Sequence, residues 1–365
     1  MTDPQQDQQQ KVILTAAFAA VTAILVAKFG DVQLDLLKKF AVLIARYGVG
    51  DLLLYAMRKA SKASVDQLQK DIPALVARVV GRAAHDGAAA ADQNGSGSGG
   101  DLTPRSPLFG DSWESHADRS ARAIREDLAG KLNSLGYRIT RYADDVYQAV
   151  QADASTAQVL RETPAAAQHL AYRKVVSQGI SGFTDSKGRN WELSAYVEMA
   201  TRTAAERAFN VSHLDRMQAL GFDLFTVTDD GHPCPLCAPW QGKILSAAPD
   251  SRADATIDEA TAAGLFHPRC RHVLAGVIPG VTDIPAPHEW NDDDQRRYDE
   301  SQTQRRLERD IRAAKREEAA AFTPEMRSQA QFGLRRAQAR MRDFIDQTGR
   351  VRNRRREQVN LGAKP

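Results

Sequence analysis

Two short segments decide the fold of this chain: Cys234-Pro235-Leu236-Cys237 and His267-Pro268-Arg269-Cys270-Arg271-His272. In each segment, two residues separate a pair of side chains that bind soft metal ions, a spacing that wraps a tight turn around a metal. Three thiolates and one imidazole are typical of a structural zinc tetrahedron. The sequence therefore predicts a zinc site with no position open for a catalytic water, formed by Cys234, Cys237, His267 and Cys270.

The fourth ligand and the role of the cysteines leave alternatives open. His272 or His232 could each replace His267, which is preferred because it repeats the spacing of the first segment. The chain has three cysteines, all in one window, and an odd, clustered set is a poor disulfide framework. Cys234 and Cys237 could be a redox pair, although no thioredoxin-like context surrounds them, or plain buried cysteines.

A zinc deaminase is the alternative from the enzyme class. Its signature joins Pro-Cys-x-x-Cys, present here from Pro233 to Cys237, to a His-x-Glu whose glutamate transfers protons. Upstream, the chain has only His116-x-Asp118 and His213-x-Asp215, and the shorter aspartate would place its carboxylate differently. Because no Ser/His/Asp set, P-loop or dinucleotide motif is present either, the sequence predicts a non-enzymatic protein without a small-molecule substrate.

The first 84 residues predict a helical region made of several pieces. Apolar residues recur there at three- and four-residue spacing, as on the buried face of a helix. Gly48 and Gly50 are expected to break the run, and Ser64 and Asp71 to cap the later pieces.

The apolar stretch 12–27 and the segment 85–112 need separate interpretations. The 16 residues of 12–27 would rise about 24 Å as a helix, less than the ~30 Å of a membrane core. We therefore expect a buried or partner-facing helix and no membrane anchor. Residues 85–112 are rich in Ala, Gly, Ser and Pro, which bury too little surface to offset the entropy of ordering, so they are predicted to be a flexible linker.

Residues 113–290 are predicted to form the middle domain that carries the metal site. Amphipathic helices are expected to lead to a β-hairpin over 181–191, with its turn at 185–188. A helix over 192–220 and a strand over 222–228 then deliver the chain to Cys234. The predicted fold class is mainly α with a small β unit stapled by zinc: an α+β middle domain between helical N- and C-terminal regions.

The last segment, 291–365, predicts a basic helical tail. Two helices are expected, over 295–320 and 324–348, the second starting at Thr323-Pro324. Residues 295–365 hold 19 Lys/Arg and 10 Asp/Glu, a net charge of +9, whereas the preceding residues hold 30 and 36, a net charge of −6. A tail of this kind could meet an acidic partner through Arg352, Arg354, Arg355 and Arg356, or could be a solvated helix face.

Several motifs, in order along the chain, carry a resemblance to a known family. They are Gly182-Phe183-Thr184-Asp185-Ser186-Lys187-Gly188-Arg189-Asn190-Trp191-Glu192-Leu193 and the segments 196–203, 234–243, 267–272, 306–312 and 340–356. Together they resemble phage minor capsid proteins of the minor capsid protein 2 type, relatives of the MuF-type head morphogenesis proteins. One departure is Gln241, where MuF relatives often have Asp, although the turn there needs only Gly242.

The resemblance implies a minor structural protein of a tailed-phage head that acts in head assembly near the portal vertex. It implies the portal protein and other head proteins as partners, and possible contact with packaged DNA. The implied location is the virion, and the host cytoplasm during assembly. The alternatives are a zinc-dependent nucleic-acid enzyme such as a deaminase and a DNA-binding protein that acts through the basic tail alone.

Overall fold

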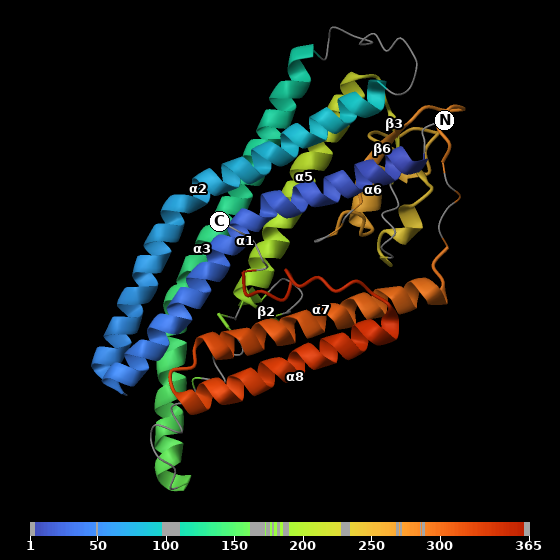
Figure 1. Cartoon of the computed structure of the whole chain (residues 1–365). Coiled ribbons are helices and arrows are strands. Elements are labelled where there is room, and N and C mark those ends of the chain that lie inside the picture. The colour runs from blue at the N-terminus through green and yellow to red at the C-terminus, as the bar shows by residue number, and fades with distance from the viewer. Residues whose placement is uncertain are drawn as a thin grey trace. The chain divides into compact units, whose positions relative to one another are not determined.

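Long helices make up most of the chain, as the sequence predicts (Figure 1). The computed structural model describes residues 4–48, 50–96, 110–160, 172, 176, 179–180, 183–184, 190–227, 234–267, 270, 272–284, 286 and 289–360. The longer helices are α1 (Pro4–Tyr47), α2 (Asp51–Ser96), α3 (Gly110–Leu160), α5 (Leu193–Ala219), α7 (Asp292–Ala319) and α8 (Pro324–Thr348). Among the described residues, no helix combines the length and apolar character needed to cross a membrane.

The predicted break after the first helix is confirmed, but the predicted caps within the second helix are wrong. Gly48 has a positive φ of 62°, a conformation that glycine adopts at little cost, and it ends α1. The helix α2 then runs without interruption through Ser64 and Asp71. It continues because its buried residues recur at helical spacing from Leu53 to Ala83, so that one face is apolar along this length.

The elements that lead into the metal site agree with the sequence. Strands β1 (Phe183–Thr184) and β2 (Asn190–Trp191) pair antiparallel, which confirms the hairpin, while its turn at 185–188 lies outside the described residues. Helix α5 occupies most of the predicted range and ends before Gly221, whose φ is 92°.

A four-stranded sheet follows α5, in the order β5-β4-β3-β6. Its strands are β3 (Leu224–Val227), β4 (Ile244–Ser246), β5 (Ala255–Thr256) and β6 (Leu274–Val277). Two short helices lie between the strands, η1 (Ala238–Trp240) and α6 (Ile257–Ala262). The central strand β3 is buried at every position and pairs antiparallel with both β4 and β6, while β4 and β5 are parallel. The mixed sheet with surrounding helices confirms the mainly α fold class with a small β unit.

The C-terminal helices start where the sequence predicts, but the tail beyond them differs. The hydroxyl of Thr323 accepts a hydrogen bond from the Met326 N–H, and Pro324 takes the first helical position of α8. Helix α8 ends at Gly349, whose φ of 67° is left-handed. Residues 350–360 contain turns and no helix, so the predicted helical tail is helical only as far as Thr348.

The contacts divide the chain into two compact units, each assembled from three separated segments. One unit contains Met1–Thr22, Val76–Leu128 and Met199–Ser301, and its buried core surrounds the four-stranded sheet. The other contains Ala23–Leu75, Ala129–Glu198 and Gln302–Pro365, and Tyr172 is one of its largest fully buried side chains. The division into domains at 1–84, 85–112, 113–290 and 291–365 stays a prediction.

Residues 85–96, predicted to begin a linker, continue helix α2, and Gly87 and Ala91 within them are packed. Ala91 is fully buried in the same apolar cluster as Met217 and Phe225. A side chain at Gly87 would collide with the backbone carbonyl of Phe209, so α5 crosses α2 closely at this point. Composition misled the prediction because alanine is the strongest helix former, and small residues are what a close helix crossing requires. Residues 97–109 lie outside the described residues.

This crossing predicts opposite effects for two glycine substitutions in α2. Gly87→Ala should lower the free energy of unfolding by about 1–3 kcal/mol, because the rigid backbone of α5 has to move. Gly81→Ala is the matched control: nothing lies within 4 Å of its Cβ position, so helix propensity should raise the stability by up to about 1 kcal/mol. Urea denaturation of both variants measures the difference. Equal effects would mean that residues 85–96 do not pack as described.

Candidate metal centre

The register of the central strand brings the two Cys/His segments to one end of the sheet. In the antiparallel pair of β3 and β6, Val227 lies opposite Leu274. The chain therefore leaves β3 beside the point where it enters β6. The Cys234–Cys237 segment follows β3 and the His267–Cys270 segment precedes β6, so strand pairing places both segments at the same end.

Each segment closes a tight turn of the same kind. The Cys237 N–H donates to the Cys234 carbonyl at 3.1 Å, and the Cys270 N–H donates to the His267 carbonyl at 2.9 Å. The predicted equivalence of the two segments is thus present in the backbone. Phe266, just before the second turn, has a φ of 57°, and it is the one non-glycine residue with positive φ among the described residues. Its packing against the core of the sheet unit holds this uncommon conformation.

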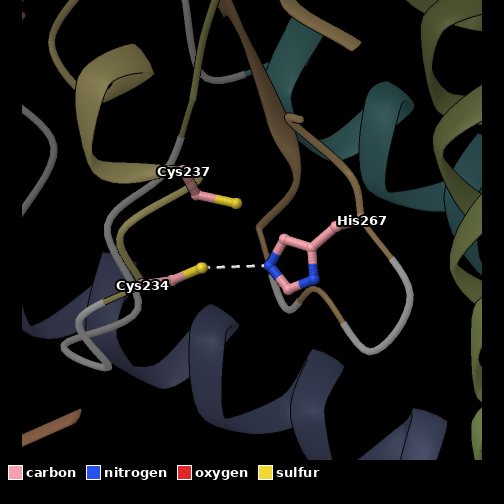
Figure 2. A group of neighbouring side chains, drawn as sticks. All are labelled: Cys234, Cys237 and His267. Atoms are coloured by element: carbon pink, nitrogen blue, oxygen red, sulfur yellow. Dashed lines mark hydrogen bonds between the residues drawn. The ribbon is translucent and has the colours of Figure 1, made fainter. Parts of the chain in front are cut away.

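The side chains of the two segments converge (Figure 2). The sulfurs of Cys234 and Cys237 both point toward the imidazole of His267, and Cys234 Sγ lies 3.0 Å from His267 Nε2. Cys237 Sγ lies 3.6 Å from Cys270 Sγ, which in turn lies 3.4 Å from His272 Nδ1. Cys237 belongs to two groups whose ligand atoms lie within 4.8 Å of one another, one with Cys234 and His267, the other with Cys270 and His272. These five residues lie close together and could hold a metal ion.

The cysteines affect one another's ionisation. Hydrogen bonding with Cys237 is the largest cause that lowers the pKa of Cys234 and of Cys270 below the usual range of cysteine. The hydrogen bonds of His267 and His272 add to this effect. Hydrogen bonding with Cys234, then with Cys270, and burial raise the pKa of Cys237. A metal ion bound here would displace the protons of the thiols and bind three thiolates.

One sulfur–sulfur distance also resembles that in a tetrahedral metal site. Sulfurs bound to zinc at about 2.3 Å at the corners of a tetrahedron lie about 3.8 Å apart. The separation of 3.6 Å between Cys237 and Cys270 is close to this value. Cys237 and Cys270 are buried, whereas Cys234 is half-buried, so the centre lies at the edge of the core with one side near solvent. The residues present therefore fit a bound metal.

Gln241 takes part in the site, which the sequence interpretation missed. It is buried, and its Nε2 lies 3.0 Å from Nε2 of His272. If the amide nitrogen donates to this ring nitrogen, Nδ1 carries the proton of His272 and donates it to Cys270. The expectation that only Gly242 matters in this turn is incomplete. An isolated β-bridge pairs Gln241 with Val227 at the end of β3, and spacing in the sequence does not predict this pairing.

Glu206 of α5 is a second residue that the sequence did not single out. Burial raises its pKa to about 7, although Arg202, at 3.0 Å, acts in the opposite direction. The negative charge of Cys270 raises this pKa further and His267 lowers it, so the carboxyl group responds to the charge of the Cys/His cluster.

The other histidines considered from the sequence do not join this cluster in the described part of the chain. His213 is buried in α5 and its Nδ1 lies 3.2 Å from the carbonyl of Gly87. It stacks on Phe209, and burial lowers its pKa, as for a core histidine. His232 lies outside the described residues, as does the side chain of His116.

The four tail arginines divide into two kinds. Arg352 makes a two-pronged ion pair with Glu357, at 2.6 and 2.8 Å. Arg356 pairs with Glu308 at 2.9 Å, and its carbonyl accepts a hydrogen bond from Arg312 at 2.6 Å. Arg354 and Arg355 are exposed. Arg356 therefore joins the tail to α7, and Arg352 closes an ion pair within the tail, while Arg354 and Arg355 face solvent.

Comparison with known proteins gives one match. The family model of phage minor capsid protein 2 matches residues 25–346, nearly the whole chain. No curated protein and no solved structure matches the chain.

Proposed function

The chain belongs to the phage minor capsid protein 2 family, and is thus a structural protein of a phage head; we propose that it acts there in head assembly, near the portal vertex, without enzymatic activity. The observation that carries this proposal is the family match over 25–346, which includes both Cys/His segments and helices α7 and α8. The portal protein and other head proteins are the proposed partners, and the virion is the proposed location after assembly in the host cytoplasm.

The metal in this proposal is a structural zinc ion held by Cys234, Cys237, Cys270 and His267. Sulfur-rich ligand sets favour zinc among the common divalent ions, and four protein ligands leave no position for a reacting water. The contacts of His272 favour hydrogen bonding to a metal ligand over binding of the metal itself, because one ring nitrogen faces Gln241 and the other faces Cys270. A hydrogen bond from a residue that does not itself bind the metal orients the ligand and changes the charge on its sulfur.

The alternative ligand set replaces His267 by His272. It requires Nδ1 of His272 to bind the metal, and its Nε2–H to donate to the amide oxygen of Gln241. The contact between Cys234 and His267 supports the first set, because it joins the two segments across the centre. In either set the ion links the loop after β3 to the loop before β6, so it would stabilise the end of the sheet.

Purified, reduced protein should contain about one zinc per chain, measured by elemental analysis. Cys234→Ser and Cys270→Ser should lose the ion and lower the thermal stability sharply, because metal-binding energy becomes folding energy. His267→Ala should lose zinc, whereas His272→Ala should keep it with about 10–100-fold weaker affinity. The control is His85→Ala, an exposed position away from the two segments.

The outcomes of this experiment separate the proposals. Loss of zinc in His272→Ala together with retention in His267→Ala would replace the ligand set and keep the zinc. Freshly purified protein without zinc would refute the metal proposal. Zinc-dependent turnover of cytosine or adenine bases would instead support the deaminase alternative, although neither His116 nor His213 supplies the glutamate that such an enzyme uses.

For the tail, we propose that Arg354 and Arg355 contact an acidic partner, while Arg356 holds the tail against α7 and Arg352 shapes the tail through its pair with Glu357. The net charge of +9 over 295–365 supports a role for the exposed residues Arg354 and Arg355 in binding an acidic partner. Arginine suits both carboxylate and phosphate groups, because its planar fork donates two parallel hydrogen bonds. Arg356 has a structural role instead. The side chain of Glu308 is 4% exposed, so its buried negative charge needs the positive charge that Arg356 provides.

Charge reversal of Arg354 and Arg355 together should leave thermal stability unchanged and reduce incorporation into phage particles. Arg356→Ala should instead lower the free energy of unfolding by about 3–5 kcal/mol at most, because it leaves Glu308 without this partner.

If DNA is the partner, the double variant should also weaken DNA binding for all sequences alike and flatten its salt dependence. If the portal is the partner, only the portal pull-down should weaken. Incorporation, DNA binding and portal binding that all stay unchanged would leave these arginines as a solvated surface.

A further inference from the structure

A groove lies at the turn between α1 and α2, within the unit that contains Ala23–Leu75. Its volume is about 730 Å³, in the range of pockets that accept several bulky side chains. Its lining is mostly apolar and includes Val42, Leu52 and Tyr55, with Lys38, Lys39 and Lys59 at the rim.

The apolar side chains of the groove are not those that build the core. On α1 the buried positions are Leu36, Leu37, Phe40 and Ile44, which follow helical spacing on another face. In contrast, Val42 is 63% exposed, Leu52 69% and Tyr55 65%. Single exposed apolar residues are common, but several around one concave surface mark a site of interaction. Folding of the helix pair does not account for these residues.

The rim of the groove is positively charged. Lys38 and Lys59 are exposed on opposite helices, and Lys39 is paired with Asp35 at 2.7 Å. None of the residues that line the groove is acidic. A second copy of this chain would bring the same lysines face to face, which opposes a symmetric dimer through this surface. A partner with acidic side chains would instead be attracted.

We propose that this groove binds an amphipathic helix of another protein, with its apolar ridge in the groove and flanking Asp or Glu residues beside Lys38 and Lys59. Apolar side chains of such a helix, at three- and four-residue spacing, would contact Val42, Leu52 and Tyr55. The concave shape favours a helix over a lipid surface, because a bilayer contacts projecting side chains and does not enter a groove. The proposal is independent of the metal centre and of the tail.

A display library of helical peptides tests this proposal without a known partner. Each peptide has about 18 residues, with leucine fixed at one face by helical spacing and the flanking positions random. The full chain is the bait, and selected peptides are measured by fluorescence anisotropy. We expect Asp and Glu to be enriched at the flanking positions. Affinity should fall at least tenfold in Lys38→Glu/Lys59→Glu, through charge, and in Leu52→Asp, through loss of the apolar contact.

Two controls make the result specific. Arg78→Glu reverses a charge at an exposed position of the same helix outside the groove, and it should leave affinity unchanged. Thermal melts of all variants should match, since the changed side chains are exposed. Enrichment of neutral or basic flanks, or selected peptides whose affinity survives Leu52→Asp, would overturn the proposal.

Two further measurements address other occupants. Sedimentation with phosphatidylglycerol vesicles, abolished by Leu52→Asp, in the absence of peptide binding would show a lipid surface instead. Self-association that the same variant abolishes, seen by analytical ultracentrifugation, would show a second copy of the chain. Either result would overturn the proposal.

Discussion

The antiparallel pairing of β3 with β6 is the interaction on which the candidate metal centre depends. Val227 and Leu274 are opposite each other in this pair, and the two Cys/His segments are the chain immediately outside it. A shift of this register by one residue would turn every buried side chain of β3 to the other face. Phe225 and Val227 share one face of β3 and lie in the apolar cluster of the sheet unit, where a one-residue shift would place Thr226. The hydrophobic core of the sheet therefore also fixes the geometry of the sulfurs.

The other unit relies on ionic contacts between distant segments. Arg316 of α7 is almost fully buried, donates to Glu192 at 2.6 Å and donates to the Val176 carbonyl at 3.2 Å. Buried pairs of this kind add little net stability, but they penalise any arrangement that separates the partners. The pairing of Arg356 with Glu308 extends the same principle to the tail. Part of the positive charge that appears to be a binding surface in the sequence, including Arg316 and Arg356, is therefore used inside the fold.

Small residues and hydrogen-bonding side chains had roles that composition hid. Gly87 and Ala91 belong to a stretch that resembles a linker, yet they permit a close helix crossing and fill a core. Gln241 was assigned no role, and its amide contacts His272 beside the cysteines. In both cases the informative neighbour lies far away in the chain, so no local pattern could reveal it.

The sequence by itself determined the helical character, the hairpin, the glycine that ends α1, the start of α8 and the candidate ligands, because spacing, capping and turn chemistry act over a few residues. The sequence also identified the family, because several of the family's motifs occur in order along the chain. Tertiary structure alone decided that Gly87 and Ala91 are packed within a helix, that Arg352 and Arg356 are paired, and that both His267 and His272 lie beside the cysteines. These outcomes depend on which distant groups meet. What a buried charge, a close helix contact or a metal ligand contributes to the free energy of folding depends on its neighbours in the folded chain, and not on the type of residue alone.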